Sequence, residues 1–156
     1  MRKSKVLAKL RSGRVARICS LGVPMLYFPS LATHFGFDGV WLDAEHRVWN
    51  PQEANQILAE CYAADLDGVF RSGSKEKNAL SRLLEDGASG LMIPHVSGPE
   101  EARALVNATK FPPQGDRGIC GAGRDAGYWV GRPEDFPQAA NRETFCLLYT
   151  SPSPRD

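Results

Sequence analysis

The sequence predicts an α/β protein, a partial (β/α)8 barrel with about four to five strand-helix units around a parallel sheet. Three observations lead to this prediction. Short apolar runs follow a recurring pair of a small or acidic residue and glycine. Helical patterns with recognisable ends lie between these runs. Polar side chains gather just after each apolar run, where a barrel keeps its functional groups.

The strands are predicted first, from runs that are nearly continuous rather than alternating. Asp38–Leu42, Asp67–Phe70 and Ser89–Ile93 have this form, which is typical of parallel strands covered on both faces by helices. An earlier strand is plausible at Val15–Cys19, and a fifth begins near Phe145–Tyr149. The order of the units predicts right-handed crossovers.

Helices are predicted between the strands. Asn50 can cap a helix that has Pro51 at its first position and Glu53 three residues after the cap. The other helices are expected from a cap at Ser74 to Gly87, from Pro99 to the Pro112-Pro113 pair, from Leu31 to Phe35 and from Lys5 to Leu10.

Polar residues favour a closed barrel over an open doubly wound sheet. They follow the second, third and fourth strands: Asp43, Glu45 and His46, then Arg71 and Ser72, then Pro94 and His95. An open sheet needs such residues only beside its switch point, whereas all strands of a (β/α)8, or TIM, barrel converge on one mouth. Because a barrel typically needs about 250 residues, we expect the sequence to be incomplete.

The end of the chain supports this expectation. We predict that residues 1–145 are the amino-terminal part of a barrel. Residues 146–156 are expected to be a tail that is disordered or artefactual, resembling translated adapter sequence, because two prolines follow Ser151 without any apolar period. An ordinary disordered terminus is the alternative.

Composition excludes few partners. A formal net charge of +1 provides no overall field for nucleic acid or an anionic membrane. The amino terminus is basic, and the first acidic residue is Asp38. A helix with a solvated basic face is the favoured interpretation, against a nucleic-acid arm or a transit peptide. No apolar stretch has the roughly 18 residues of a membrane span, so we expect a cytoplasmic protein without membrane or nucleic-acid partners.

Two other features have mainly structural interpretations. The cysteines (Cys19, Cys61, Cys120 and Cys146) are far apart and lack metal-site spacing, so we expect reduced thiols that are mostly buried. The glycine-rich stretch 112–123 lacks the Walker spacing, and we expect an ordered loop near the mouth rather than a nucleotide site.

The candidate catalytic residues lie in and after the run Asp43-Ala44-Glu45-His46. A carboxylate beside a histidine can fix its tautomer for general-base catalysis, although caps and ion pairs use the same residues. Arg71 ends an apolar strand, where it can form an ion pair with Asp43 or Glu45 or bind a ligand carboxylate or enolate. His95 is equally compatible with substrate contact and with loop packing, and His34 is expected on a helix surface.

Several motifs together resemble the HpcH/HpaI aldolases, class II pyruvate aldolases that include 4-hydroxy-2-oxoheptanedioate and 2-keto-3-deoxy sugar acid enzymes. The resemblance runs from about Leu7 to Phe145. Its motifs are residues 37–46 (FDGVWLDAEH), 69–71 (VFR), 87–96 (GASGLMIPHV), 100–103 (EEAR) and 111–118 (FPPQGDRG).

This resemblance implies a lyase that cleaves a 4-hydroxy-2-oxo acid to pyruvate and an aldehyde with a divalent metal (Mg, Mn or Co) as Lewis acid. It implies His46 as acid/base with Asp43 orienting it, Arg71 on the keto oxygen, Pro94 and His95 at the substrate, and Glu45 as support. The glutamate and aspartate that bind the metal are expected beyond the matching region, so this chain is expected to be inactive alone. Arg47–Asn50 departs from the family's proline-containing turn and leaves the aldehyde open. Full-length relatives are expected to be homo-oligomers, commonly hexamers.

A non-enzymatic alternative also remains. In it the chain is a half-barrel that dimerises to close its sheet and binds a small carboxylate at the mouth without turnover.

Overall fold

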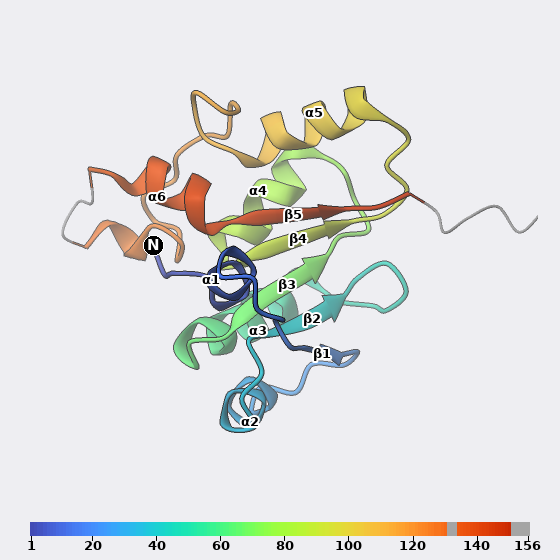
Figure 1. Ribbon diagram of the computed structural model, residues 1–156, viewed down its shortest axis with the longest axis vertical. Helices are drawn as coiled ribbons and strands as arrows, with labels where there is room; N and C mark the ends of the chain where they lie inside the picture. The colour runs from blue at the N-terminus through green and yellow to red at the C-terminus, as the bar shows by residue number, and fades with distance from the viewer. Residues whose placement is uncertain (131–133, 151–156) are drawn as a thin grey trace, which may run out of the picture.

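The computed structural model describes residues 1–130 and 134–150 (Figure 1). It contains one five-stranded parallel sheet in the order β1-β2-β3-β4-β5, so each strand lies beside its neighbour in sequence. The strands are β1 (Ile18–Leu21), β2 (Gly39–Asp43), β3 (Asp67–Arg71), β4 (Gly90–Ile93) and β5 (Phe145–Leu148). The helices are α1 (Lys5–Arg11), α2 (Phe28–His34), α3 (Pro51–Ala63), α4 (Lys77–Glu85), α5 (Pro99–Thr109) and α6 (Phe136–Glu143). This arrangement confirms the predicted parallel α/β architecture.

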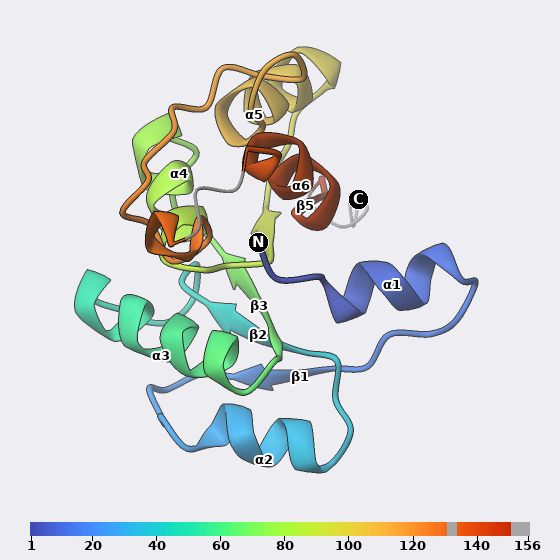
Figure 2. The same ribbon diagram turned by 90° about the vertical axis from the view of Figure 1, so that its left-hand side faces the viewer.

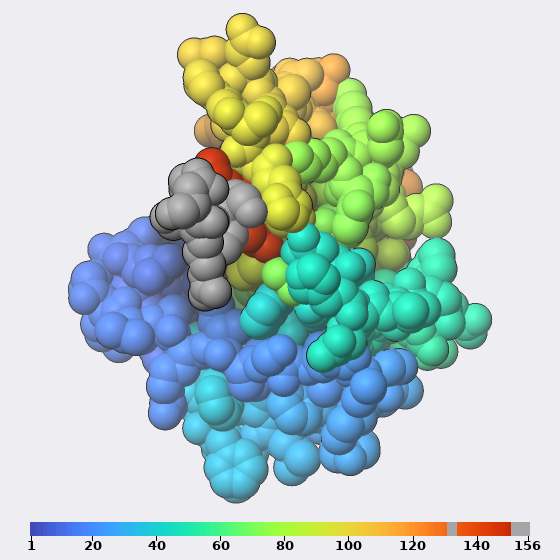
Figure 3. All heavy atoms as spheres, turned by 90° about the vertical axis from the view of Figure 1, so that its right-hand side faces the viewer, coloured from blue at the N-terminus to red at the C-terminus, as the bar shows by residue number. Residues whose placement is uncertain are grey.

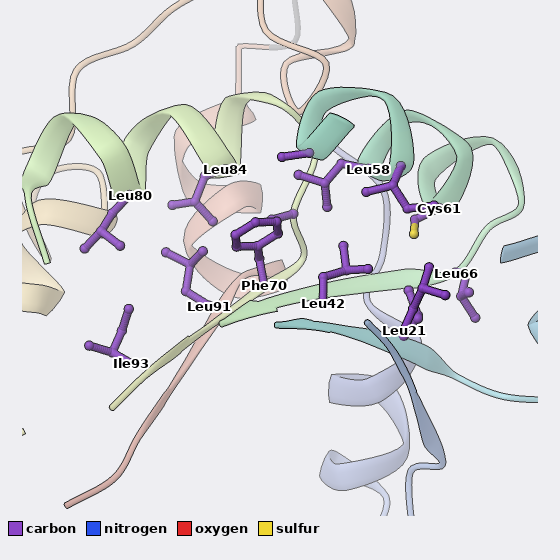
Figure 4. Packing of buried hydrophobic residues seen from close by; sticks show 14 of the residues in the cluster. Leu21, Leu42, Leu58, Cys61, Leu66, Phe70, Leu80, Leu84, Leu91 and Ile93 are labelled. Carbon is purple, nitrogen blue, oxygen red and sulfur yellow. The ribbon is translucent and has the colours of Figure 1, made fainter. Parts of the chain in front are cut away.

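The main core lies between the sheet and the helices that follow its strands (Figure 4). Leu42 of β2, Phe70 of β3 and Leu91 of β4 point toward α3 and α4, where they meet Leu58 and Leu84. Each of these side chains is at most 4% exposed. Burial of such large apolar side chains is the main force that holds helices on a sheet.

The recurring glycine at the strand starts has a packing role. At Gly68, an added Cβ would lie only 2.7 Å from the Leu58 side chain of α3. At Gly90, it would collide with the ring of Phe145 on β5. The missing side chains therefore allow a helix or a neighbouring aromatic ring to approach the strand closely.

The basic amino terminus pairs with acidic residues at the amino-terminal edge of the sheet. Helix α1 lies on the opposite side of the sheet from α3 (Figure 2). Asp67, which begins β3 and is fully buried, accepts hydrogen bonds from the Ser4 hydroxyl, the Val6 backbone N–H at 2.9 Å and the Arg2 guanidinium. Lys9 binds Asp38, the first acidic residue, at 2.8 Å. The expectation of a solvated basic face therefore does not hold for these residues, whose charges are used within the chain.

Several predicted boundaries are wrong. The first strand begins at Ile18 rather than Val15, whose side chain is 81% exposed. Helix α4 begins at Lys77, and the Ser74 hydroxyl instead accepts a hydrogen bond from the Glu76 N–H in the turn before it. Helix α5 ends at Thr109, before the proline pair. A serine hydroxyl accepts the same kind of hydrogen bond in a turn as at a helix start, which explains the shift at α4.

Two further expectations need correction, and one helix was missed. The glycine-rich loop packs outside the sheet against α4 and α5, not at the mouth: the Arg124 N–H binds the Glu85 carbonyl, and the Arg117 N–H binds the Lys110 carbonyl. Only Cys61 among the four cysteines is fully buried, and Cys120 is exposed. Helix α6, which packs Phe136 against Phe111, has too short an apolar pattern to have been recognised.

No helix in the described part of the chain is long and apolar enough to cross a membrane. Of the predicted tail at residues 146–156, the first residues belong to β5, and residues 151–156 lie outside the described residues.

Candidate active site

Ionisable side chains from three neighbouring strands meet at the carboxyl edge of the sheet. Parallel register places Asp43 of β2 opposite Arg71 of β3, and Arg71 opposite Met92 near the end of β4. The segments that follow β2 and β4 (cyan and yellow) gather at this end of the molecule (Figure 3). The sheet therefore brings Asp43, Glu45, His46, Arg71 and His95 together, as the order of the strands predicts.

Arg71 and Asp43 form the centre of the cluster. Arg71 donates from Nε to Asp43 Oδ1 at 2.8 Å and from Nη2 to Asp43 Oδ2 at 2.6 Å. Asp43 Oδ1 also accepts the backbone N–H groups of Glu45 and His46, at 3.0 and 3.2 Å. Asp43 thus fixes the turn after β2 and the guanidinium of β3 at the same time.

These contacts shift the pKa of both partners. Hydrogen bonds from Arg71 lower the pKa of Asp43 to about 2, overcoming the opposing effect of burial. The same hydrogen bonds raise the pKa of Arg71 above its ordinary value. Both groups therefore remain ionised throughout the neutral range.

Glu45 links the ion pair to the two histidines. Its Oε2 lies 2.9 Å from Arg71 Nη1 and 3.7 Å from the Nε2 of His46. Its Oε1 lies 3.2 Å from the Nε2 of His95. One carboxylate, only 15% exposed, therefore faces an arginine and two imidazoles.

The histidines line the exposed side of the cluster. The His46 side chain is 65% exposed, and its nearest carboxylate is that of Glu45. Asp43 orients His46 through the backbone N–H rather than through the ring. His95 has a left-handed φ of 53°, its carbonyl accepts a hydrogen bond from Lys75 at 2.7 Å, and the preceding Pro94 is buried. His34 is exposed at the end of α2, as predicted.

Two other residues of the cluster were not among the predicted site residues. The Trp41 ring lies under the Arg71 guanidinium, with 4.8 Å between its centroid and Cζ. Tyr149, within the predicted tail, accepts a hydrogen bond from Arg71 Nη1 at 3.0 Å and donates to Glu45 Oε2 at 3.2 Å. The period of two along β2 could have identified Trp41, because residues 41 and 43 share one face of the strand.

The described residues do not supply a metal centre. Within residues 1–130 and 134–150, no group of three or more His, Cys, Asp or Glu side chains could hold a metal ion. Asp43 and Glu45, which carry the acidic oxygens at the mouth, both face Arg71. This donor set does not fit a divalent cation, and the prediction that the ligands lie outside the matching region stays a prediction.

Parallel strands with acid, base and guanidinium groups at one carboxyl edge define a barrel-type α/β enzyme site. A family model for HpcH/HpaI aldolase/citrate lyase matches residues 27–150. The chain belongs to this family, and the predicted family resemblance is confirmed.

The relatives are aldolases. The hydroxypyruvate/pyruvate aldolase of Sagittula stellata is 38% identical over 113 residues, which cover 72% of this chain and 44% of the relative. The pyruvate aldolase of Rhizobium etli is 32% identical, over 90% of this chain and 54% of the relative. The crystal structure of an HpcH/HpaI aldolase from Desulfitobacterium hafniense superposes with a TM-score of 0.82 at 26% identity, covering 92% of this chain and 55% of that one.

The chain spans about half the length of the relatives it matches. With the parallel sheet, this likeness confirms a partial (β/α)8 barrel. The division at residue 145 stays a prediction, and the family match continues to residue 150, beyond β5.

Proposed function

We propose that the parent protein is a carbon-carbon lyase that cleaves a 4-hydroxy-2-oxo acid to pyruvate and an aldehyde. The observation that carries the proposal is the convergence of Asp43, Arg71, Glu45 and two histidines on one edge of the sheet. The relatives' identity as aldolases supports the same reaction class.

In the proposed reaction, His46 takes the proton from the 4-hydroxyl group. The bond between C3 and C4 then breaks, the aldehyde leaves, and the electrons of the broken bond form the enolate of pyruvate. The protonated His46 returns its proton to C3, which gives pyruvate. Arg71 binds the keto oxygen and stabilises the negative charge that develops there. Asp43 and Glu45 hold Arg71 and His46 in place, while Pro94 and His95 border the substrate.

A divalent metal (Mg, Mn or Co) is part of this proposal for the parent enzyme, as Lewis acid at the oxo acid. Because the described donor set does not fit a metal, we propose that this chain does not turn over substrate alone. We further propose that the full-length enzyme is a cytoplasmic homo-oligomer whose partners are small oxo acids and aldehydes.

Binding provides the first test, because it does not depend on turnover. Arg71 has one N–H on Nη2 beyond the contacts described above, and its Nη1 is shared between Glu45 and Tyr149. We expect ligand-observed NMR to detect oxalate, a planar analogue of the enolate, bound to the chain. Arg71→Lys should weaken this binding at least about 10-fold, since the ammonium cannot reproduce the fork of the guanidinium. His34→Ala is the matched control and should bind like the wild type; equal binding by Arg71→Lys contradicts the proposed site.

Turnover provides the second test. Pyruvate release from a 4-hydroxy-2-oxo acid is followed with lactate dehydrogenase in the presence of manganese. We expect none from this chain. Release that a chelator abolishes and His46→Gln removes would support the lyase but contradict the proposed inactivity of the chain.

A further inference from the structure

Trp41 lies on the face of the sheet that carries the candidate site. Along β2, Val40 and Leu42 belong to the core under the helices, so Trp41 and Asp43 point to the opposite face. In the register of the sheet, Arg71 of β3 is the partner of Asp43, two residue pairs beyond Val69, the partner of Trp41. Trp41 therefore lies one layer below the ion pair.

The indole covers one face of the guanidinium. The Cζ of Arg71 lies 4.8 Å from the centroid of the Trp41 ring, within the range of a cation–π interaction. Asp43 holds the edge of the same group through Nε and Nη2. Edge and face contacts together fix the plane of the guanidinium, whose Nη1 lies 2.9 Å from Glu45 and donates to Tyr149.

In the described part of the chain, no hydrogen bond holds the Trp41 indole in place of its contact with Arg71. Its Nε1 is buried there without a hydrogen-bond partner. A buried donor without an acceptor costs free energy. The stacking surface that the ring offers to Arg71 is the compensating contact.

We propose that Trp41 is a positioning residue for the oxo-acid site: its ring fixes the plane of the Arg71 guanidinium, so that the N–H of Nη2 that Asp43 does not use is presented to a ligand oxygen. This inference rests on the proposed function. It requires an aromatic face at position 41 rather than the indole N–H. It adds a determinant of affinity that none of the ionisable residues supplies.

The test compares Trp41→Phe with Trp41→Leu, using oxalate as the probe and calorimetry to measure its affinity. Phenylalanine keeps a π-face and should remain within about 3-fold of the wild type, whereas leucine should weaken binding by about 10-fold. Trp49→Leu is the matched control. Its indole packs edge to face against Phe70 on the helix side of the sheet, so this variant should lose stability without losing affinity.

A second measurement does not need a ligand. In NMR spectra, the Arg71 Nε–H should show a ring-current shift and slow solvent exchange, both lost in Trp41→Leu and kept in Trp49→Leu. If Trp41→Leu leaves oxalate affinity or the Nε–H signal unchanged, the proposal for Trp41 is overturned. If the wild type does not bind oxalate while Trp41→Leu alters the Nε–H signal, the proposed function fails, and Trp41 positions Arg71 for the fold alone.

Discussion

Arg71 of β3 donates two hydrogen bonds to Asp43 of the adjacent strand β2, and neither side chain is more than 13% exposed. The pair lies where parallel strands end together, so its geometry depends on sheet register rather than on flexible loops. The pair also anchors the turn that carries Glu45 and His46. Stability and the candidate site therefore depend on the same contact.

Replacement of Asp43 should lower the free energy of unfolding only at pH values where its carboxyl group is ionised in the wild type. The pKa of Asp43 falls from 3.8 to about 2 in the folded state, so the carboxylate stabilises the fold fully above pH 3.8, and this stabilisation is lost as the pH falls toward 2. We expect Asp43→Asn to lower the free energy of unfolding by about 2 kcal/mol at pH 7. Urea unfolding from pH 7 to pH 2 should show the wild type and variant converging.

Asp116→Asn is the control for this experiment. Asp116 pairs with Lys77 on the surface, where 59% of its side chain is exposed, so its replacement should change stability little at any pH. A constant difference between Asp43→Asn and the wild type down to pH 2 would argue against the ion pair as its cause.

Asp67 should be the most sensitive acidic residue at the amino-terminal edge of the sheet. It is fully buried and accepts hydrogen bonds from Ser4, Val6 and Arg2. Asp67→Asn leaves Arg2 without its buried partner, so we expect a loss of about 3 kcal/mol in the free energy of unfolding. Trypsin should then cleave faster within α1, at Lys9 or Arg11.

Asp65→Asn is the matched control, because Asp65 also pairs with Arg2 but is 62% exposed. It should leave both the unfolding curve and the trypsin pattern close to those of the wild type. Equal protection of α1 in the Asp67→Asn and wild-type chains would show that α1 is held by other contacts.

Gly68 should not tolerate a methyl group. An added Cβ would lie 2.7 Å from Leu58, so α3 must shift or Leu58 must change rotamer. We expect Gly68→Ala to cost about 1–3 kcal/mol, as overpacking does in other cores. At Gly118 an added Cβ has nothing within 4 Å, so Gly118→Ala provides the control in thermal unfolding. Similar melting temperatures for the two variants would exclude close α3 packing as the reason for glycine.

Exposed apolar side chains on both edge strands should cause self-association. In the described chain, β1 and β5 are the edges of the sheet, and Ile18 and Leu147 are 37% and 41% exposed. We expect light scattering to show association that increases with concentration and is reduced by Ile18→Lys. A discrete dimer would instead favour the half-barrel alternative, and a stable monomer would contradict both expectations.

The sequence by itself determined the parallel architecture, because continuous apolar runs and capped helices depend on short-range patterns. It also determined which residues meet at the mouth, since strands of one parallel sheet end on the same side. Capping residues such as Ser74 gave the wrong helix start, because a turn uses the same hydrogen bonds as a cap.

Only the tertiary structure decided how the charges are paired. Lys9 and Asp38, or Arg2 and Asp67, are far apart in the chain, and nothing local indicates that they meet. The sequence left Asp43 and Glu45 as alternative partners of Arg71, and it did not indicate that Glu45 also faces two histidines or that Trp41 lies under the guanidinium. Local pattern specifies strands and helices because backbone hydrogen bonds and side-chain periodicity act over a few residues, whereas side-chain partners depend on how the strands are aligned in space.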